Sequence, residues 1–379
     1  KPLITHRFKI EEASKAYELL NDDSALGILL QYSAKEESIL RNSVIQLNSS
    51  NSISYLPSDC VVGFIGAGNY ASSTLIPAFK LAGSKLDTLV TSSGLSGFHY
   101  GQKAGFREAT TELDVLWNSD KINTVVIVTR HDSHAVQVKS ALESGNHVFV
   151  EKPLALSLKE LEGIDVTIQS VNKGKTNPLR LMVGFNRRFA PHILKMKSLL
   201  LSRQEPKTII MTINAGEIPS DHWTQDPGVG GGRIIGEGCH FIDLMRFLAG
   251  SSITDFKVMM IGDVPGADVL DDKVSICLSF ADGSIGTIHY FANGGKSFPK
   301  ERIEVFCGGS ILHMDNYRVL KGYDWPGFKK MKLTKQDKGQ KACAKAFVSA
   351  ICEGKNSPIP YDEIMESSRV TIQVAESLK

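Results

Sequence analysis

The spacing of apolar residues between positions 58 and 186 predicts a parallel sheet covered by helices. Short runs that are apolar on both faces alternate there with stretches whose apolar residues recur at helical spacing. The runs are Val61–Ile65, Leu86–Thr91, Thr124–Thr129, Asn146–Val150 and Leu179–Phe185. This alternation is typical of a doubly wound α/β domain.

A second pattern occupies residues 187–379 and predicts a sheet-rich α/β domain. Five segments are apolar throughout or alternate with polar residues: Thr208–Ala215, Phe256–Ile261, Val274–Phe280, Ser284–Phe291 and Ile303–Cys307. A tight turn at residues 281–283 joins two of them. Ala342–Ile351 and Asp362–Leu378 have the spacing of helices.

The first 57 residues follow neither pattern. An amphipathic helix is predicted near the start, with apolar side chains at Phe8, Ile10, Ala13, Tyr17 and Leu20. The segment LGILLQY, which ends at residue 32, has the composition of a short buried strand. Residues 33–57 are polar and serine-rich, which is typical of a linker. From pattern alone, residues 1–32 are a small N-terminal addition to the two domains.

Composition and charge exclude several classes of protein. The chain has 379 residues, enough for two domains. With 42% hydrophobic and 22% charged residues, it does not resemble a disordered, collagen-like or coiled-coil protein in composition. There are 43 Lys and Arg against 41 Asp and Glu, so no overall field attracts nucleic acid or an anionic membrane. We interpret the basic run at residues 327–341 as a solvated loop, because Phe328 is its only aromatic residue.

Cysteine usage and the lack of a long apolar run predict a cytoplasmic protein. The six cysteines are scattered, without a C-x-x-C pair or a Cys/His cluster at zinc spacing. This predicts free thiols in a reducing compartment and no metal site. No apolar run reaches the roughly 18 residues that a membrane span needs. The chain begins at Lys1 without an initiator Met and stops inside a predicted helix, so we expect it to be part of a longer protein.

A glycine-rich turn follows the first strand of the parallel sheet. Gly66 permits a tight turn from strand to helix, Gly68 lets the backbone approach a pyrophosphate, and Ala71 allows close packing of helix on strand. Asn69 and Tyr70 lie in the same turn, and the helix that follows presents free N–H groups to phosphates. The sequence therefore predicts a dinucleotide site here. The alternative is a glycine-rich turn that binds nothing.

The end of the second strand bears on the choice between NAD and NADP. A carboxylate there would hold the ribose 2′-hydroxyl of NAD, but the residues at this position are Ser92, Ser93 and Gly94. Small hydroxyl side chains do not repel a 2′-phosphate, and Lys103 or Arg107 could reach toward one. The sequence thus favours NADP slightly and leaves NAD open.

Four motifs carry a resemblance to a known family. They are GFIGAGNYA from residue 63, TRHDSHAVQVKSALESGNHVFVEKP from residue 129, GFNRRFAP from residue 184 and GCHFIDLMRFL from residue 238. Over residues 58–379 the chain closely resembles the Gfo/Idh/MocA oxidoreductases, named after glucose-fructose oxidoreductase, inositol dehydrogenase and the rhizopine catabolism protein. The resemblance implies a Rossmann domain over residues 58–186 and, over residues 187–379, an α/β domain whose open, mostly antiparallel sheet serves in homo-oligomers. It also implies NAD(P)-linked redox chemistry on sugars, polyols or nucleotide sugars.

The first 32 residues resemble a different family. The motif ITHRF (residues 4–8), followed by EEA (residues 11–13), is similar to the C-terminal tail of zinc-type medium-chain alcohol dehydrogenases. The match is confined to these residues, so it implies no alcohol dehydrogenase activity in this chain. It implies an upstream dehydrogenase-like domain joined to the chain, as in bacterial two-dehydrogenase fusions.

Lys152 is the predicted general base. Oxidation of an alcohol by hydride transfer needs a group that takes the hydroxyl proton. Lys152 directly follows a parallel strand, at the edge of the sheet where ligands bind in this fold. In the family, the lysine of the Glu-Lys-Pro motif contacts the reacting hydroxyl, and the resemblance assigns that role to Lys152. We expect Thr129, His134 and Glu151 to lie beside the cofactor; from pattern alone, Glu151 and Lys152 could be ordinary charges at a strand end.

The helix that begins near residue 238 is predicted to complete the catalytic site. The family pattern is Asp-x-x-x-His, which this chain meets at His240 but not at Gly236. Glu237 could supply the carboxylate from the next position. Asp243 lies three residues after His240, on the same face of the helix, and we place it with the substrate residues. Lys152 and His240 are the better-supported catalytic pair.

Arginine and tryptophan side chains near these motifs favour a large, anionic, ring-shaped substrate. The guanidinium groups of Arg187, Arg188 and Arg233 suit a carboxylate or phosphate, and Trp223 can stack on a sugar or base. A nucleotide sugar or a uronate fits this set better than a neutral polyol. The alternative is structural: Arg188 could cap a strand end and Trp223 could fill the seam between the domains.

Two other hypotheses on function remain. The chain could be a dinucleotide-binding regulatory or scaffold module that has lost catalysis, although Lys152 and His240 are both present. It could also be a half-enzyme whose activity needs the upstream domain.

Overall fold

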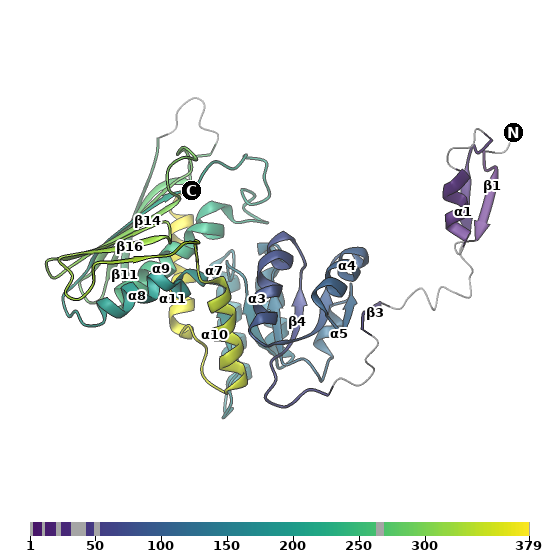
Figure 1. Ribbon diagram of the computed structural model, residues 1–379, viewed down its shortest axis with the longest axis horizontal. Helices are drawn as coiled ribbons and strands as arrows, with labels where there is room; N and C mark the ends of the chain where they lie inside the picture. The colour runs from purple at the N-terminus through teal and green to yellow at the C-terminus, as the bar shows by residue number, and fades with distance from the viewer. Residues whose placement is uncertain are drawn as a thin grey trace. The chain divides into compact units, whose positions relative to one another are not determined.

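The computed structural model describes residues 3–9, 12–19, 24–31, 43–48, 54–262 and 269–378. The chain divides into two compact units, residues 1–45 and residues 46–379 (Figure 1). In the first unit, strands β1 (His6–Lys9) and β2 (Ile28–Gln31) pair in parallel, and helix α1 (Ala13–Glu18) lies between them in the chain. The predicted helix and strand are therefore present, but Phe8, expected in the helix, lies in β1, and β2 alternates between half-buried and exposed residues instead of being buried. The expectations for Ile10, Leu20 and residues 32–42 and 49–53 fall outside the described residues.

The predicted parallel sheet follows, with two strands that the sequence did not predict. Its strands are β3 (Val44–Gln46), β4 (Val61–Ile65), β5 (Lys85–Val90), β6 (Glu108–Thr110), β7 (Thr124–Ile127), β8 (His147–Val150) and β9 (Leu181–Val183). The two unpredicted strands are β6, and β3, which lies within residues 33–57, interpreted above as a linker. Their order is β3-β6-β5-β4-β7-β8-β9, and β4 to β9 pair in parallel. Every residue of β4 and β7 is buried, which explains why these strands are apolar on both faces. The order reverses at β4, so the switch point of the sheet lies between β4 and β7.

Helices cover both faces of this sheet. They are α3 (Ile76–Leu81), α4 (Gly94–Ala104), α5 (Asp114–Trp117), α6 (His134–Glu143) and α7 (Leu158–Asn172). Helix α7 begins with a capping box, in which the Glu160 N–H donates to the Ser157 hydroxyl and the Ser157 N–H donates to the Glu160 carboxylate. This box fixes the start of the helix at Leu158, eight residues after the end of β8.

A helix from the C-terminal part of the chain also packs on this sheet. Helix α10 (Gln340–Cys352) lies against α3 (Figure 1). The ring of Phe347 is 5.6 Å from that of Phe149 and 6.5 Å from that of Phe79, between ring centroids. The core of the predicted first domain therefore includes residues that we assigned to the second.

The second sheet has eight strands and is mostly antiparallel, as expected. Its strands are β10 (Thr208–Asn214), β11 (Ile253–Met260), β12 (Lys273–Phe280), β13 (Ile285–Phe291), β14 (Glu301–Cys307), β15 (Ser310–Asp315), β16 (Val319–Tyr323) and β17 (Lys330–Lys332). Their order is β11-β12-β13-β10-β14-β15-β16-β17, with β10 parallel to β13 and the other neighbours antiparallel. The fold is thus a Rossmann-type parallel sheet followed by a domain with a mostly antiparallel sheet.

Three helices cover one face of the second sheet. They are α8 (Pro191–Leu200), α9 (Cys239–Ala249) and α11 (Tyr361–Glu376), which lie on one side of the sheet in Figure 1. Alternate strand residues such as Met211, Ile276 and Val305 are buried beneath them in one core. On the open face, Met259, Cys277 and Phe306 are exposed.

The basic run at residues 327–341 differs in part from the loop that we expected. Residues 330–332 form strand β17, which pairs with β16, and Phe328 is buried. Lys338 from the same run forms an ion pair with Glu301. None of the described helices is long and apolar enough to cross a membrane, and the six cysteines are free thiols.

Candidate active site

The glycine turn adopts the geometry that a dinucleotide needs. Gly66 has a φ of 103°, and a Cβ at this position would lie 2.6 Å from the Val128 carbonyl oxygen. Only glycine satisfies both constraints without strain. A Cβ on Gly68 would have no atom within 4 Å, so the backbone at that position is open to an approaching phosphate.

A cavity of about 850 Å³ opens from this turn. It is lined by the ends of β4, β5 and β7, the glycine turn and the first two turns of α4. Of the predicted cofactor residues, the lining includes Gly66, Gly68, Ser92 and Thr129. The sequence did not single out the other polar lining residues, which are Thr91, Ser96, Tyr100, Thr111, Arg130 and Gln137. The size and the hydroxyl-rich lining suit the adenosine and pyrophosphate parts of a dinucleotide.

The remaining residues of the turn have supporting contacts. The Asn69 carbonyl accepts bonds from the hydroxyls of Ser72 and Ser73. Ala71 is buried at the start of a short π-helical turn, Ala71–Leu75, that leads into α3. Tyr70 contacts the carboxyl group of Glu151. Ser93 occupies the N-cap position of α4.

The two cations proposed to reach a 2′-phosphate are not placed for it. Arg107 precedes β6, at the amino edge of the parallel sheet, where it binds Asp87 and Glu108. The dinucleotide cavity lies at the opposite, carboxyl edge. Lys103 lines a different hollow, between α3 and α4. The expectation that either side chain holds the phosphate of NADP is therefore not supported by their positions.

Lys152 links the two domains at the carboxyl edge of the parallel sheet. Its Nζ donates to the carbonyl oxygen of Gly236 at 2.6 Å. Gly236 lies in the π-helical turn Ile234–Gly238, which leads directly into α9. The expected base thus meets a turn 84 residues further along the chain, directly before the helix that carries the expected histidine.

His240 lies in the first turn of α9, and its ring packs edge-on to Phe185. It is 6% exposed, and its Nδ1 has no hydrogen-bond partner among the described residues. Burial, together with the charges of Arg187 and Lys152, lowers the pKa of His240 well below its ordinary value. The structure therefore presents a neutral imidazole near Lys152.

Glu237 is held in the ionised form by three neighbours. Its carboxylate accepts hydrogen bonds from Tyr290 at 2.7 Å and Arg233 at 2.8 Å, and forms an ion pair with Lys300 at 2.8 Å. Burial alone would raise the pKa of Glu237, but these donors lower it far below its ordinary value. A carboxylate held in this way cannot exchange a proton near neutral pH. Tyr290 and Lys300 were not predicted, because they lie 53 and 63 residues from Glu237.

Three of the residues predicted to contact the substrate form buried ion pairs instead. Arg187 binds Glu301 through two hydrogen bonds of 2.9 Å, and Arg188 binds Asp243 through bonds of 2.8 and 2.7 Å. Asp243 has no exposed surface. These side chains are already engaged with each other, so the structure gives Arg187, Arg188 and Asp243 a role in packing rather than in contacting a substrate. Arg233 is likewise paired with Glu237.

Trp223 lies at the carboxyl edge, as a substrate contact there would require. Its ring is half-buried and meets the ring of His131 edge-on, 4.9 Å between centroids. The Arg130 guanidinium is 5.7 Å from the same ring. Trp223 therefore joins the loop before α9 to the end of β7, which agrees with both the seam and the stacking interpretations.

Glu151 and His134 are deeply buried beside the expected cofactor site. Burial raises the pKa of Glu151 to about 7, and its carboxyl group packs on Gly184, where a Cβ would lie 2.7 Å from Oε1. The two ring nitrogens of His134 face the carbonyl oxygens of Pro153 and Thr129. These contacts support the backbone on both sides of Lys152.

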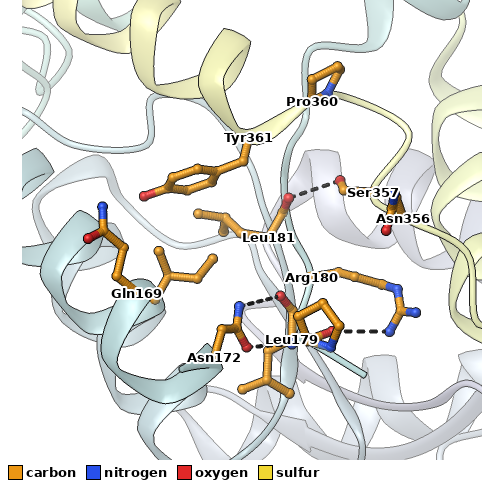
Figure 2. Close-up of a pocket in the computed structure, with 11 residues that line it drawn as sticks. Gln169, Asn172, Leu179, Arg180, Leu181, Asn356, Ser357, Pro360 and Tyr361 are labelled. Atoms are coloured by element: carbon orange, nitrogen blue, oxygen red, sulfur yellow. Dashed lines mark hydrogen bonds between the residues drawn. The ribbon is translucent and has the colours of Figure 1, made fainter. Parts of the chain in front are cut away.

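A second hollow, of about 450 Å³, lies at the amino edge of the parallel sheet (Figure 2). It is lined by α7 and by the segments that precede β9 and α11. The Asn172 amide binds both the N–H and the carbonyl of Leu179, and the Ser357 hydroxyl donates to Leu181 (Figure 2). Since these groups satisfy one another and the hollow is at the edge opposite Lys152, we do not include it in the site.

Comparison with known families agrees with this geometry. Residues 60–175 match the family described as "Oxidoreductase family, NAD-binding Rossmann fold", and residues 205–311 match "GFO/IDH/MocA C-terminal domain". The chain carries both domains of the Gfo/Idh/MocA oxidoreductases.

Among the described residues, no group of three or more His, Cys, Asp or Glu is arranged to hold a metal ion.

Individual relatives share the fold at low sequence identity. Inositol 2-dehydrogenase of Rhizobium meliloti (strain 1021) is 26% identical over 255 residues, which cover 64% of this chain and 74% of that protein. An oxidoreductase domain protein from Kribbella flavida has a TM-score of 0.72 at 23% identity, covering 85% of this chain and 98% of that one. Levoglucosan dehydrogenase in complex with NADH and levoglucosan has a TM-score of 0.73 at 19% identity, covering 84% and 97%. Several of the proteins that resemble this chain are named as dehydrogenases or reductases of sugars and polyols.

Proposed function

We propose that the chain is an NAD(P)-dependent oxidoreductase that transfers a hydride between the nicotinamide and a hydroxyl or keto carbon of a sugar, polyol or nucleotide sugar. The observation that carries this is the contact between Lys152 Nζ and the Gly236 carbonyl. It brings the end of β8, beside the dinucleotide cavity, to the helix that carries His240. A dinucleotide and two candidate proton-handling groups then share one edge of the sheet.

Each group has a distinct part in this scheme. The bound nicotinamide supplies the hydride acceptor or donor. Lys152 Nζ takes the hydroxyl proton during oxidation and returns it during reduction. His240 stays neutral and offers a ring nitrogen to the substrate hydroxyl. Glu237, fixed as a carboxylate, stabilises positive charge beside the site and does not exchange protons.

The class of substrate rests on the relatives and on Trp223. Inositol and levoglucosan are ring compounds with several hydroxyl groups, and proteins that resemble this chain are named for acting on them. Trp223, at the carboxyl edge, could stack on such a ring. A nucleotide sugar or uronate remains within the proposal, but Arg187 and Arg188 give it no support because both are paired with carboxylates.

For the cofactor we propose NAD(P), with a slight preference for NADP. Ser92 lines the cavity at the end of β5, and the lining contains no carboxylate among the described residues. The lining therefore has no carboxylate that would repel a 2′-phosphate or accept a hydrogen bond from a 2′-hydroxyl.

We further propose that the full protein is cytoplasmic, carries a fused upstream dehydrogenase-like domain, and forms homo-oligomers through the open face of the second sheet.

The test is turnover with a defined panel. Myo-inositol, levoglucosan and UDP-glucuronic acid are each mixed with the protein and with NAD or NADP, and reduced cofactor is followed by absorbance. We expect oxidation of at least one of the three. Tight NADH binding without turnover of any would indicate a binding module, or a half-enzyme if the longer fusion restores activity. Binding of NADH without NADPH would reject the NADP preference.

A further inference from the structure

His131 lies against the same glycine that Lys152 binds. It opens the short 3-10 helix His131–Ser133 that follows β7, at the carboxyl edge of the parallel sheet. A Cβ built on Gly236 would lie 3.1 Å from His131 Cε1 and 3.6 Å from its Nδ1. The imidazole therefore occupies the space that a side chain at position 236 would need. Lys152 approaches the same residue through its carbonyl oxygen.

The contacts of His131 fix its tautomer. Nδ1 lies 2.8 Å from the carbonyl oxygen of Gly230, and because a carbonyl oxygen can only accept, Nδ1 must carry the hydrogen. Burial, with the charge of Lys152 next, lowers the pKa of His131 to about 3, so the ring is neutral at physiological pH. A neutral imidazole protonated at Nδ1 has a lone pair at Nε2. Among the described residues, no group donates a hydrogen bond to that nitrogen.

A polyol substrate needs such an acceptor beside Lys152. The guanidinium groups can only donate, and Lys152 Nζ accepts only from the hydroxyl that reacts, so any other hydroxyl of the ring that donates its hydrogen needs a separate acceptor. The nearby carboxylate of Glu237 already accepts from Tyr290, Arg233 and Lys300. His240 is assigned to the reacting hydroxyl, so among the described neighbours of Gly236 the Nε2 lone pair of His131 is available as an acceptor for a second hydroxyl.

We propose that His131, whose imidazole lies where a side chain at Gly236 would be, contacts the substrate by accepting a hydrogen bond from a ring hydroxyl at Nε2. This rests on the function proposed above. The Trp223 ring, edge-on to the imidazole, and the Gly230 carbonyl hold the ring in place. His131 thereby determines which hydroxyl of a polyol lies beside Lys152.

Two variants separate this role from a purely structural one. In His131→Asn, the amide nitrogen can take the place of Nδ1 and keep the bond to Gly230, but nothing replaces Nε2. In His131→Gln, the longer amide reaches the place of Nε2 and the bond to Gly230 is lost. We expect His131→Asn to lower kcat/KM on the best substrate of the panel by about tenfold or more, with the NADH dissociation constant and the thermal midpoint unchanged, and His131→Gln to retain more activity. Wild-type kcat/KM in His131→Asn, with loss in His131→Gln, would show that the ring only holds the loop and would overturn the proposal.

A double-mutant cycle that combines substitutions at His131 and Gly236 provides a second test. Gly236→Ala should lower kcat/KM in the wild-type background, because its Cβ would lie only 3.1 Å from His131 Cε1 and would push the imidazole out of its position. In the His131→Asn background, the atom that the Cβ would meet, Cε1, is missing. There the same change should lower kcat/KM by no more than about twofold, because the effects of substitutions at two contacting residues are not additive. Equal losses in both backgrounds would contradict the proposal. A wild-type protein that binds NADH but oxidises none of the panel would instead contradict the proposed function, and this inference with it.

Discussion

At the scale of single residues, the candidate site is a cluster of charges that mostly neutralise one another. Arg187 pairs with Glu301, Arg188 with Asp243, and Glu237 with two cations. Against this background, Lys152 contacts a backbone carbonyl and His240 retains a buried nitrogen without a described partner. The neighbouring charges are already paired, so the groups that still lack hydrogen-bond partners are the ones expected to contact the substrate.

Removing either proton-handling side chain should abolish most of the turnover. We expect Lys152→Ala and His240→Ala each to lower kcat by about 100-fold or more, because each would remove a group that acts on the reacting hydroxyl. Initial rates on the best substrate of the panel, with NADH affinity measured alongside, check this. Lys159→Ala, at an exposed position of α7, is the matched control and should retain the wild-type rate. Near wild-type turnover in Lys152→Ala would disprove its assignment as the base.

Glu151 predicts a pH dependence of stability. Burial raises its pKa from an ordinary 4.5 to about 7, so between these pH values the folded protein holds a proton that the unfolded chain has released. Its contribution to the free energy of unfolding therefore falls as pH rises through this range, by about 2–3 kcal/mol. Glu151→Gln, which cannot ionise, should gain stability relative to wild type by that amount between pH 5 and pH 8 in urea unfolding. Glu162→Gln, at an exposed position of α7, shows the effect of removing a carboxylate in general; an equal gain there would contradict the assignment.

The individual residues that the sequence could predict lie in continuous motifs. Gly66, Lys152 and His240 each follow or begin an element whose pattern is local, so their neighbourhood along the chain fixed their position. The contact of Lys152 with Gly236 and that of Glu237 with Lys300 could not be predicted, because the two partners come from segments far apart in the chain. The same limit explains Arg187 and Asp243: the sequence shows a charge but not the opposite charge that neutralises it.

At the scale of elements, the parallel sheet was predictable and the assembly of the second domain was not. Strands such as β4 and β7 are buried on both faces, and this appears directly as apolar runs. The pairing of β10 with β13 depends on contacts between segments 77 residues apart, which periodicity does not contain. Helix α10 was predicted as a helix, but its packing on the first sheet rather than the second depends on the tertiary position of Phe347.

Helix α10 should contribute strongly to the stability of the Rossmann core. Phe347 is fully buried, so Phe347→Ala should lower the free energy of unfolding by about 3–5 kcal/mol through lost burial and the cavity left behind. Phe98→Ala, at an exposed position of α4, should cost less than about 1 kcal/mol. Urea unfolding of both variants makes the comparison. A small loss for Phe347→Ala would mean that α10 does not form part of this core.

At the scale of the whole molecule, residues 46–379 form one unit in which a dinucleotide cavity and a helix from the second domain meet at one sheet edge. The central claim is that this edge binds a nicotinamide dinucleotide. Calorimetric titration with NADH and NADPH tests it most directly, on the wild type, Gly66→Ala and Gly83→Ala. Both glycines have a positive φ, 103° and 94°, but a Cβ at Gly66 meets the Val128 carbonyl whereas one at Gly83 meets nothing within 4 Å. We predict binding by the wild type and by Gly83→Ala, and at least a tenfold weaker affinity in Gly66→Ala. Binding of neither dinucleotide by the wild type, or equal affinity in all three proteins, would contradict the account.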